Sequence, residues 1–325
     1  MNPKQTNTAI AILNWNGKHW LEKFLPNVLE HSDEAQIYVI DNASTDDSVA
    51  FVEKYFPTVK IIKNTKNSGF AGGYNEGLQH INEEIYCLLN SDVQVTENWI
   101  SPITTLFENH PEIAAIQPKI RSFEADQYFE FAGAGGGMMD NLGYPYCRGR
   151  IFDDLEKDHG QYNDETEIFW ASGCALFIRR EDYWTMNGLD ERFFAHQEEI
   201  DLCWRLKNAG RKIYYCGKST VFHVGGGTLN KQSPQKTYLN IRNNLSMLLK
   251  NLPVSTLLWL IPLRLILDGI AGLYFGLKNG FPHLWAVVRA HFGFYGMASQ
   301  TWKLRGPHQI KKFYQNKWLI FKHFL

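Results

Sequence analysis

The sequence predicts an α/β fold in which a mostly parallel β-sheet is flanked by helices. Four short apolar runs recur in the first hundred residues and start roughly 25 residues apart: 9–13, 37–40, 59–62 and 85–89. Helix-like segments lie between them, at residues 20–31, 46–56 and 73–81. Strands that alternate with helices at this spacing are typical of a parallel sheet with right-handed connections.

The first predicted strands and helices have recognisable boundaries. Ser44 or Thr45 is expected to cap the second helix, and Pro57 to stop it. Gly69, Gly72 and Gly73 follow the third strand, where a glycine-rich turn lets backbone N–H groups approach a phosphate. An ordinary tight turn is the alternative. No GxGxxG pattern follows the first strand, which argues against a dinucleotide-binding enzyme.

The middle of the chain alternates between irregular and regular segments. Residues 120–165 are rich in Gly, Pro and Asp, and they predict loops with irregular strands. A strand at 169–179, a helix at 197–209 that ends at Gly210, and a strand at 212–216 are expected next.

The charge of the chain is distributed unevenly. Residues 231–325 contain 13 Lys and Arg but one acidic residue, Asp268, whereas the whole chain contains 33 basic and 34 acidic residues. The body therefore carries a net charge near −13 and the tail near +12. Such a tail is expected to contact an anionic partner, either a membrane surface or a nucleic acid.

The cysteines and the N-terminus indicate a cytoplasmic body. The five cysteines are scattered and form no CxxC pair, which is typical of free thiols in a reducing compartment. The polar N-terminus leads directly into the first apolar run and has no signal-peptide pattern.

Asn90, Ser91 and Asp92 directly follow the buried strand at 85–89. In open α/β sheets, ligands bind beyond the carboxyl ends of such strands, where Asp41 and Asn42 are also expected. The amide oxygen of Asn90 and the carboxylate of Asp92 suit a hard cation such as Mg²⁺ or Mn²⁺. The alternative is a strand that ends in an Asx turn.

Acidic residues open the predicted helix at 197–209. Asp201 and Arg205 are four residues apart and are expected to pair. Glu199 points elsewhere and is a candidate general base, although a solvated helix start is the alternative. His223 follows a strand-like run and is either structural or the second ligand of a cation held by Asp92. Trp170 could offer an aromatic face to a sugar, or it could be a core residue.

Taken together, these segments resemble the bacterial family 2 glycosyltransferases of the GT-A fold, particularly the rhamnosyltransferase-like members. The match runs from about Ile10 to about Asn244. It is carried, in order, by ILNWNG at 12–17, VIDNASTD at 39–46, NSGFAGGYN at 67–75, LLNSD at 88–92, GLDERFF at 188–194, EEIDLCWR at 198–205 and HVGGGT at 223–228.

The resemblance implies roles for individual residues. Asp41 would bind the base of the donor, and Asp92, in the position of the DXD motif, would be the main metal ligand. The family's catalytic base lies in a Glu-Asp pair that aligns with Glu198 and Glu199, and we assign the role to Glu199. The predicted donor-binding residues are Asn14, Asp41, Asn42, Asn67, Gly69, Phe70, Ala71, Asn75, Asn90, Ser91 and Asp92. The predicted acceptor-binding residues are Trp170, Ser172, Gly173 and Arg242, and the predicted ligands of Mg²⁺ or Mn²⁺ are Asp92 and His223.

The activity implied by the resemblance is metal-dependent, inverting transfer of a sugar, with rhamnose a candidate. The donor would be a nucleotide-diphospho-sugar and the acceptor a hydroxyl of a cell-surface glycan or a lipid-linked molecule. A sugar-nucleotide nucleotidyltransferase is one alternative, but residues 14–18 lack the Gly-rich basic loop that such an enzyme needs after its first strand. A nucleic-acid-binding protein is the other, but the aromatic residues of the tail lie with Leu and Ile at helical spacing, which favours a membrane.

The C-terminal region is expected to dock on the inner face of the cell membrane. We divide the chain into a glycosyltransferase domain at 1–250 and a basic, apolar helical region at 251–325. Residues 256–277 are long enough to cross a bilayer, which takes about 20 residues, but Pro262, Arg264 and Asp268 interrupt them. An interfacial helix is therefore favoured over a transmembrane helix or a soluble helical cap. The basic residues expected near anionic headgroups are Lys303, Arg305, Lys311, Lys312, Lys317 and Lys322.

Overall fold

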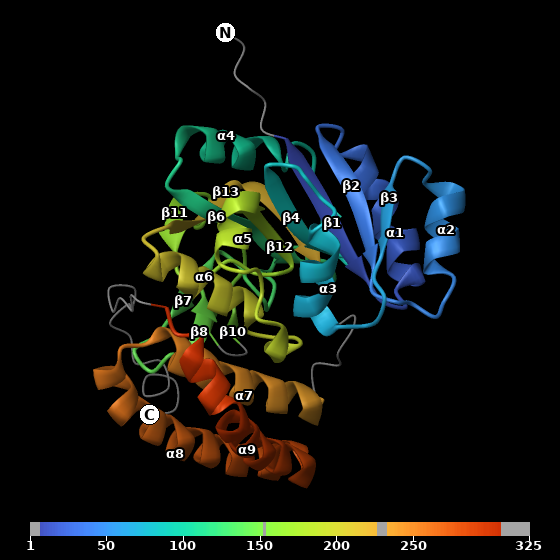
Figure 1. Cartoon of the computed structure of the whole chain (residues 1–325). Helices are drawn as coiled ribbons and strands as arrows, with labels where there is room; N and C mark the ends of the chain where they lie inside the picture. Colours follow the sequence, from blue (N-terminus) through green and yellow to red (C-terminus); the bar gives the residue numbers. More distant parts are fainter. Residues whose placement is uncertain (1–6, 152–153, 226–232, 307–325) are drawn as a thin grey trace.

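A mixed nine-stranded sheet forms the centre of the protein in the computed structural model, which describes residues 7–151, 154–225 and 233–306 (Figure 1). The strand order is β11-β13-β6-β12-β4-β1-β2-β3, and β5 pairs with β13. The strands are β1 (Thr8–Asn14), β2 (Ala35–Asp41), β3 (Lys60–Lys63), β4 (Ile85–Asn90), β5 (Val93–Val95), β6 (Ile113–Ser122), β11 (Glu165–Ile168), β12 (Ala175–Arg179) and β13 (Lys212–His223). Strands β1, β2, β3, β4, β6 and β13 share one direction, and β5, β11 and β12 run against them. The predicted α/β fold with a mostly parallel sheet is confirmed.

Helices cover both faces of this sheet. The helices of the body are α1 (Lys18–Glu30), α2 (Ser48–Tyr55), α3 (Gly69–Leu78), α4 (Ser101–Asn109), α5 (Arg180–Thr185) and α6 (Glu198–Asn208). One apolar core contains side chains of α1, α2 and α4, and the other contains side chains of α3, α5 and α6. Alternate residues of β1 point into the two cores, Ala9 and Ala11 into one and Ile10 and Ile12 into the other. The N-terminal strands are continuous apolar runs because both of their faces are buried.

Three predicted boundaries are wrong. Only residues 175–179 of the expected strand at 169–179 form a strand, β12, which lies between β4 and β6, whereas β11 ends at Ile168 and pairs with β13 near one edge of the sheet. The chain has to cross the sheet between them, so residues 169–174 belong to no strand. Helix α3 begins at Gly69 rather than Gly73, so the glycines form its first turn. Helix α2 begins at Ser48, because the Asp46 carboxylate accepts the Ser48 N–H and Ser44 bonds to Asn14 and Asn16 instead.

The irregular region at 120–165 contains a second, four-stranded sheet of short strands. These strands are β7 (Gly137–Met139), β8 (Pro145–Cys147), β9 (Arg150–Ile151) and β10 (Asp154–Leu155), in the order β10-β9-β8-β7. The predicted strand at 212–216 is longer than expected, since β13 continues to His223 with a register shift between Cys216 and Thr220. This continuation brings His223 to the same edge of the main sheet as the ends of β1, β2 and β4.

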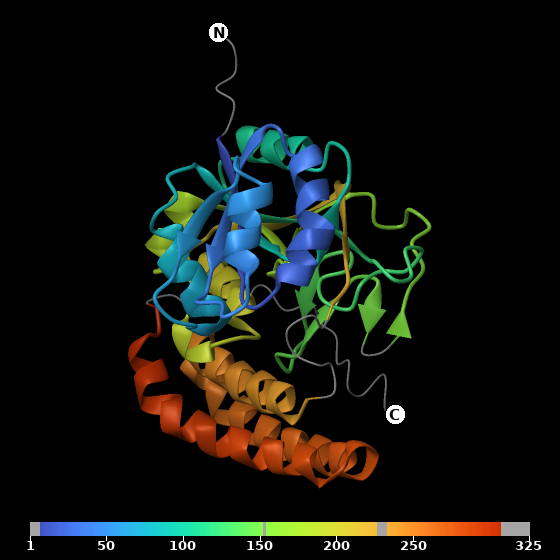
Figure 2. The same ribbon diagram turned by 90° about the vertical axis from the view of Figure 1, so that its right-hand side faces the viewer.

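Three helices form a layer below the body: α7 (Pro234–Asn251), α8 (Val254–Asn279) and α9 (Phe281–Lys303) (Figures 1 and 2). Helix α7 lies between the body and the outer pair α8 and α9. Helices α8 and α9 meet closely at Gly272, where an added Cβ would be 3.1 Å from the Val287 side chain. The predicted helix at 256–277 is part of α8. The division of the chain at residue 250 stays a prediction.

Candidate active site

The carboxyl ends of β1 and β2 form a buried polar network. Asp41 is 5% exposed, and its carboxylate accepts hydrogen bonds from Asn14 Nδ2 at 3.3 Å and the Ser44 N–H at 3.1 Å. Asn42 donates through Nδ2 to Asn67 Oδ1 and to the Gly69 carbonyl, both at 3.0 Å. The network connects the predicted base-binding carboxylate to the glycine turn of α3.

Gly69 and Asn75 fix the position of α3 at this edge. Gly69 has a φ of +73° and lies against Phe194, so an added Cβ would be 2.6 Å from the Phe194 carbonyl. That carbonyl accepts hydrogen bonds from the backbone N–H groups of Phe70 and Ala71. Asn75, predicted to contact the donor, instead uses its whole amide within the protein. It donates to Leu189 O and Glu191 Oε1, and accepts from Tyr183 Oη and the Leu189 N–H.

Asp92 and His223 lie together at the ends of β4 and β13. The Nε2 atom of His223 is 3.2 Å from Asp92 Oδ1 and 3.3 Å from Asn90 Nδ2. On the other side of the imidazole, Nδ1 lies 3.5 Å from Oε2 of Glu130, a buried carboxylate that the sequence did not mark. Burial raises the pKa of Asp92, but its hydrogen bond and charge interaction with His223 outweigh this and hold the pKa below its ordinary value. Asp92 is therefore ionised at neutral pH.

Burial lowers the pKa of His223, but Cys174, Asp92 and Glu130 around it hold the pKa well above its ordinary value, so a divalent cation that is shared with a phosphate would have to replace the imidazole proton. Adjacent ligands of such an ion lie roughly 3 Å apart, and the two donor atoms of Asp92 and His223 have that spacing. Among the described residues, no group of three or more His, Cys, Asp or Glu side chains is arranged to hold a metal. A cation bound here would take its remaining ligands from elsewhere, as Mg²⁺ does when it binds through one or two carboxylates and substrate phosphates.

Glu198 and Glu199 begin α6 after a strained loop. Phe194, His196 and Gln197 all have a positive φ, between 65° and 74°. The Oε2 atoms of both glutamates are buried, and neither has a hydrogen-bond partner within the described part of the chain. Burial raises the pKa of Glu199 to about 7, although hydrogen bonds from backbone N–H groups at the helix start lower it. Burial and the neighbouring Glu199 raise the pKa of Glu198 well above its ordinary range. Asp201 pairs with Arg205 at 2.8 Å, as predicted.

The predicted acceptor residues have structural partners. Trp170 is 5% exposed and donates its indole N–H to the Met138 carbonyl, so the core-residue alternative describes it. Ser172 is also buried and donates to the Ala132 carbonyl. Gly173 packs between Phe70 and Glu199, since an added Cβ would be 3.1 Å from the Phe70 ring and 3.8 Å from Cβ of Glu199. These contacts place Glu199 near the first turn of α3, with Gly173 between them.

Arg242 was predicted to contact the acceptor, but its guanidinium binds the protein. It donates to the carbonyls of Arg192 and Phe193 and to Asn243 Oδ1. Two other residues of α7, Asn243 and Lys250, contact the loop at 192–197 and its flanks. The sequence did not indicate these contacts, because the pattern of an amphipathic helix does not show which of its polar side chains will contact a distant loop.

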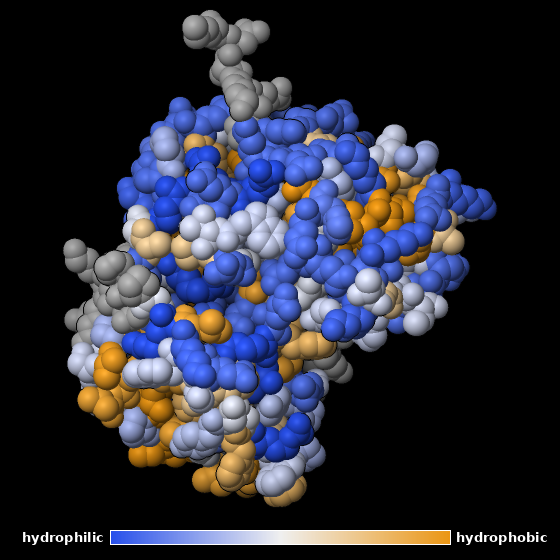
Figure 3. All heavy atoms as spheres, viewed as in Figure 1, coloured by the Kyte–Doolittle hydropathy of each residue, from blue (hydrophilic) through white to orange (hydrophobic). Residues whose placement is uncertain are grey.

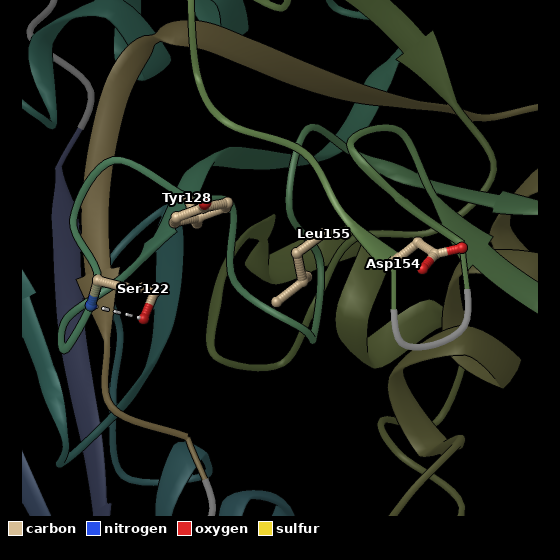
Figure 4. Close-up of a pocket in the computed structure, with 5 residues that line it drawn as sticks. Ser122, Tyr128, Asp154 and Leu155 are labelled. Atoms are coloured by element: carbon tan, nitrogen blue, oxygen red, sulfur yellow. Dashed lines mark hydrogen bonds between the residues drawn. The ribbon is translucent and has the colours of Figure 1, made fainter.

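A surface hollow of about 400 Å³ lies close to the end of β13 (Figure 4). It is lined by Ser122, Ala125, Tyr128, Asp154 and Leu155. Ser122 is the neighbour of His223 in the β6–β13 register, so the hollow adjoins the strand end that carries the histidine. None of the predicted site residues lines it.

The chain belongs to glycosyl transferase family 2, whose model matches residues 9–186. It is therefore an enzyme that transfers a sugar. The nucleotidyltransferase and nucleic-acid-binding alternatives are not supported by this match.

Curated relatives are themselves glycosyltransferases. An N-acetylglucosaminyl-diphospho-decaprenol L-rhamnosyltransferase of Mycobacterium tuberculosis is 25% identical over 231 residues, which cover 66% of this chain and 75% of the relative. The low-salt glycan biosynthesis hexosyltransferase Agl10 of Haloferax volcanii is 22% identical over 241 residues, covering 72% and 73%. Rhamnosyltransferase WbbL of Escherichia coli is 39% identical over 62 residues, 19% of this chain and 23% of that protein.

Solved structures confirm the predicted GT-A-type fold. GalNAc-T7, crystallised with UDP, GalNAc and Mn²⁺, has a TM-score of 0.60 at 16% identity, and the match covers 78% of this chain and 49% of that chain. The mannosyltransferase PcManGT from Pyrobaculum calidifontis, in complex with GDP-Man and Mn²⁺, has a TM-score of 0.53 at 13% identity, covering 92% and 84%.

Proposed function

We propose that this glycosyltransferase moves a sugar from a nucleotide-diphospho-sugar to an acceptor hydroxyl by single displacement with inversion. The observation that carries the proposal is the half-buried Glu199, whose Oε2 is buried without a hydrogen-bond partner among the described residues and whose Cβ would be 3.8 Å from a Cβ added at Gly173. Gly173 lies near the carboxyl ends of β1, β2 and β4, which we call the donor edge because we place the donor there. The Cys174 carbonyl, one residue further on, accepts the Asn90 N–H at the end of β4. Glu199, the candidate base, and the end of β4, which leads to the candidate cation ligand Asp92, therefore lie on either side of the segment at 173–174.

In this mechanism each part of the edge has one task. Asp41 and Asn67 hold the nucleoside, and the diphosphate lies between them and the Asp92–His223 pair. Glu199 takes the proton of the acceptor hydroxyl, whose oxygen then bonds to the anomeric carbon. The bond from that carbon to the diphosphate breaks on the opposite face, so the configuration inverts and the nucleoside diphosphate leaves with the bonding electrons. The transition state resembles an oxocarbenium ion, as in glycoside hydrolysis.

Asp92 and His223 would hold Mg²⁺ or Mn²⁺ together with oxygen atoms of the diphosphate. Such a cation neutralises charge that develops on the leaving group. The support is the 3.2 Å spacing of the two donor atoms and the Mn²⁺ in two structures of similar fold.

Rhamnose or another hexose is the sugar that we propose, and a lipid-linked or cell-surface glycan is the acceptor. The support comes from the names of relatives, which include a rhamnosyltransferase acting on a decaprenol diphosphate and a hexosyltransferase of glycan biosynthesis.

A panel of nucleotide-sugars tests the proposed function. Purified protein is incubated with Mn²⁺ and UDP-, GDP- or dTDP-linked hexoses, and release of the nucleoside diphosphate is measured without acceptor. We expect slow hydrolysis of one donor class, because water can replace the acceptor hydroxyl. No release from any donor, even after membrane extracts are added as a source of acceptor, would contradict the proposal.

We further propose that helices α8 and α9 dock the enzyme on a membrane surface. The two charged residues in the middle of α8, Arg264 and Asp268, are 2% and 3% exposed and face the protein. Arg264 donates to the Leu142 carbonyl and pairs with Asp268, which also accepts a hydrogen bond from Tyr144 Oη. The four-residue spacing of Arg264 and Asp268 places both side chains on one face of the helix, where they pair. Neither charge has to enter a bilayer when α8 lies on its surface.

The outward face of these helices is apolar. The exposed large apolar residues on α8 are Val254, Leu258, Trp259, Ile266, Ile270, Leu273, Tyr274 and Leu277, and those on α9 are Phe281, Trp285, Phe292, Tyr295 and Trp302. Figure 3 shows hydrophobic residues gathered over α8. A surface helix of a soluble protein normally has the reverse arrangement, with its polar face outward. By length and composition α8 is also able to cross a membrane. No other helix in the described ranges is long and apolar enough to do so.

The described residues support part of the predicted basic rim. Lys303 is exposed, but Arg305 donates to the carbonyls of Leu249 and Leu252 and stabilises the end of α7 instead. Lys311, Lys312, Lys317 and Lys322 lie outside the described residues.

Charged substitutions on the outward face test the docking. The triple variant Leu258→Glu, Ile266→Glu and Leu273→Glu should bind anionic vesicles more than about 100-fold more weakly, because each apolar side chain contributes about 1.5–3 kcal/mol when buried. Binding is measured by co-sedimentation with phosphatidylglycerol vesicles at low salt. Tyr55→Glu, at an exposed apolar position of the body, is the control and should bind normally. Full-length protein that remains soluble without detergent and ignores the vesicles would refute the docking surface.

A further inference from the structure

The loop at 192–197 determines where Glu198 and Glu199 lie, and its own conformation is unfavourable. Phe194, His196 and Gln197 adopt the left-handed region that side chains rarely occupy. A side chain in this region is unfavourable and persists only when its surroundings hold it. The contacts of this loop should therefore show what holds it.

One side chain binds three carbonyls of this loop. Nδ2 of Asn243, on α7, lies 3.0 Å from Phe193 O, 2.9 Å from Ala195 O and 2.8 Å from His196 O. Asn243 is fully buried. Its Oδ1 accepts a hydrogen bond from Nε of Arg242 at 2.9 Å, which fixes the amide with its nitrogen toward the loop.

A fourth carbonyl of the loop connects it to the first turn of α3. Phe194 O accepts the backbone N–H groups of Phe70 and Ala71 at the start of α3. Helix α7 also holds both flanks of the loop, since Nζ of Lys250 lies 2.9 Å from Asp190 Oδ2 and 2.8 Å from Asp201 Oδ2. The loop is thus held between α7 and the donor site.

We propose that Asn243 is a positioning residue that keeps the 192–197 loop in the conformation that places Glu199 at the donor edge. The proposal rests on the proposed function, because it assigns Asn243 an effect on catalysis through the base. Asn243 itself touches no reacting atom. Without its amide, three carbonyls lose a donor and the strained backbone can relax, which moves the start of α6.

A double-mutant cycle tests this effect. Asn243→Ala should lower the kcat of donor hydrolysis about 10- to 100-fold, since a misplacement of about 1 Å can cost that much. In the Glu199→Gln background the same substitution should cost little more, because residues that act through one another are not additive. Ser246→Ala is the matched control, since Ser246 lies on the same helix, is equally buried and bonds only to the Arg242 carbonyl in the described structure. Normal kcat in Asn243→Ala, or a full additional loss in the double variant, would overturn the proposal.

Hydrogen–deuterium exchange tests the loop without any substrate. Amides of residues 193–200 should exchange faster in Asn243→Ala than in wild type and in Ser246→Ala, and unchanged exchange would overturn the proposal. If Asn243→Ala does not fold, Arg242→Ala takes its place in both experiments with the same expected results, because it releases the Asn243 amide and two contacts to the loop. A wild-type protein that hydrolyses no donor would instead count against the proposed function, while the exchange experiment would still decide the role of Asn243.

Discussion

Glu199→Gln should bind the donor normally and lose most of its kcat. The substitution keeps the shape of the side chain and removes its ability to accept a proton, and general-base catalysis typically contributes ~10²–10⁴-fold. Kinetics with the donor identified by the panel would measure the loss, and titration with the nucleoside diphosphate would measure binding. Glu198→Gln is the matched control and should lose much less, because burial and the neighbouring Glu199 raise the pKa of the Glu198 carboxyl well above its ordinary range, so that Glu198 keeps its proton to higher pH than an ordinary glutamate. Full activity in Glu199→Gln together with a loss in Glu198→Gln would move the role of base one residue back.

The pH profile of the wild-type enzyme gives the same prediction a second readout. A base has to be ionised to act, and burial raises the pKa of Glu199 to about 7. Activity should therefore be complete above about pH 8 and fall as the pH drops through 7, to about 100-fold below the plateau at pH 5. An acid limb near pH 4 would indicate a carboxylate with an ordinary pKa.

Asp92→Ala should abolish transfer, and His223→Ala should weaken the metal-dependent binding of nucleotide. The lost stabilisation of leaving-group charge is several kcal/mol, which corresponds to on the order of 10³-fold in kcat. Binding of Mn²⁺ in the presence of the nucleoside diphosphate, followed by electron paramagnetic resonance, would measure the site directly. Asp47→Ala is the control, because Asp47 lies in a nearby loop with its side chain 72% exposed and paired only with Lys18 among the described residues. If both site variants keep normal activity in the presence of a chelator, the metal assignment is wrong.

The features that the sequence predicted well are those set by local pattern. Apolar runs such as 85–89 form strands that are buried on both faces. Parallel strands place their carboxyl ends at the same edge of the sheet, and Asp92 and His223 lie close together because they stand at the ends of two such strands. The buried pair in α8 follows from the four-residue spacing of Arg264 and Asp268.

The features that it missed depend on contacts between distant segments. Trp170 and Asn75 were predicted to bind the acceptor and the donor, and the internal hydrogen bonds that both make in the structure were not predicted. The contacts of Asn243 with the loop at 192–197 join residues about 50 positions apart, and no periodicity encodes them.

The configuration of the released sugar tests the central claim most directly. The donor is hydrolysed with Mn²⁺ present, and proton NMR spectra are recorded before the free sugar equilibrates between its anomers. The first product should have the anomeric configuration opposite to that of the donor, and it should not accumulate when Glu199→Gln replaces the wild-type enzyme. A first product that retains the configuration of the donor would contradict single displacement with Glu199 as the base.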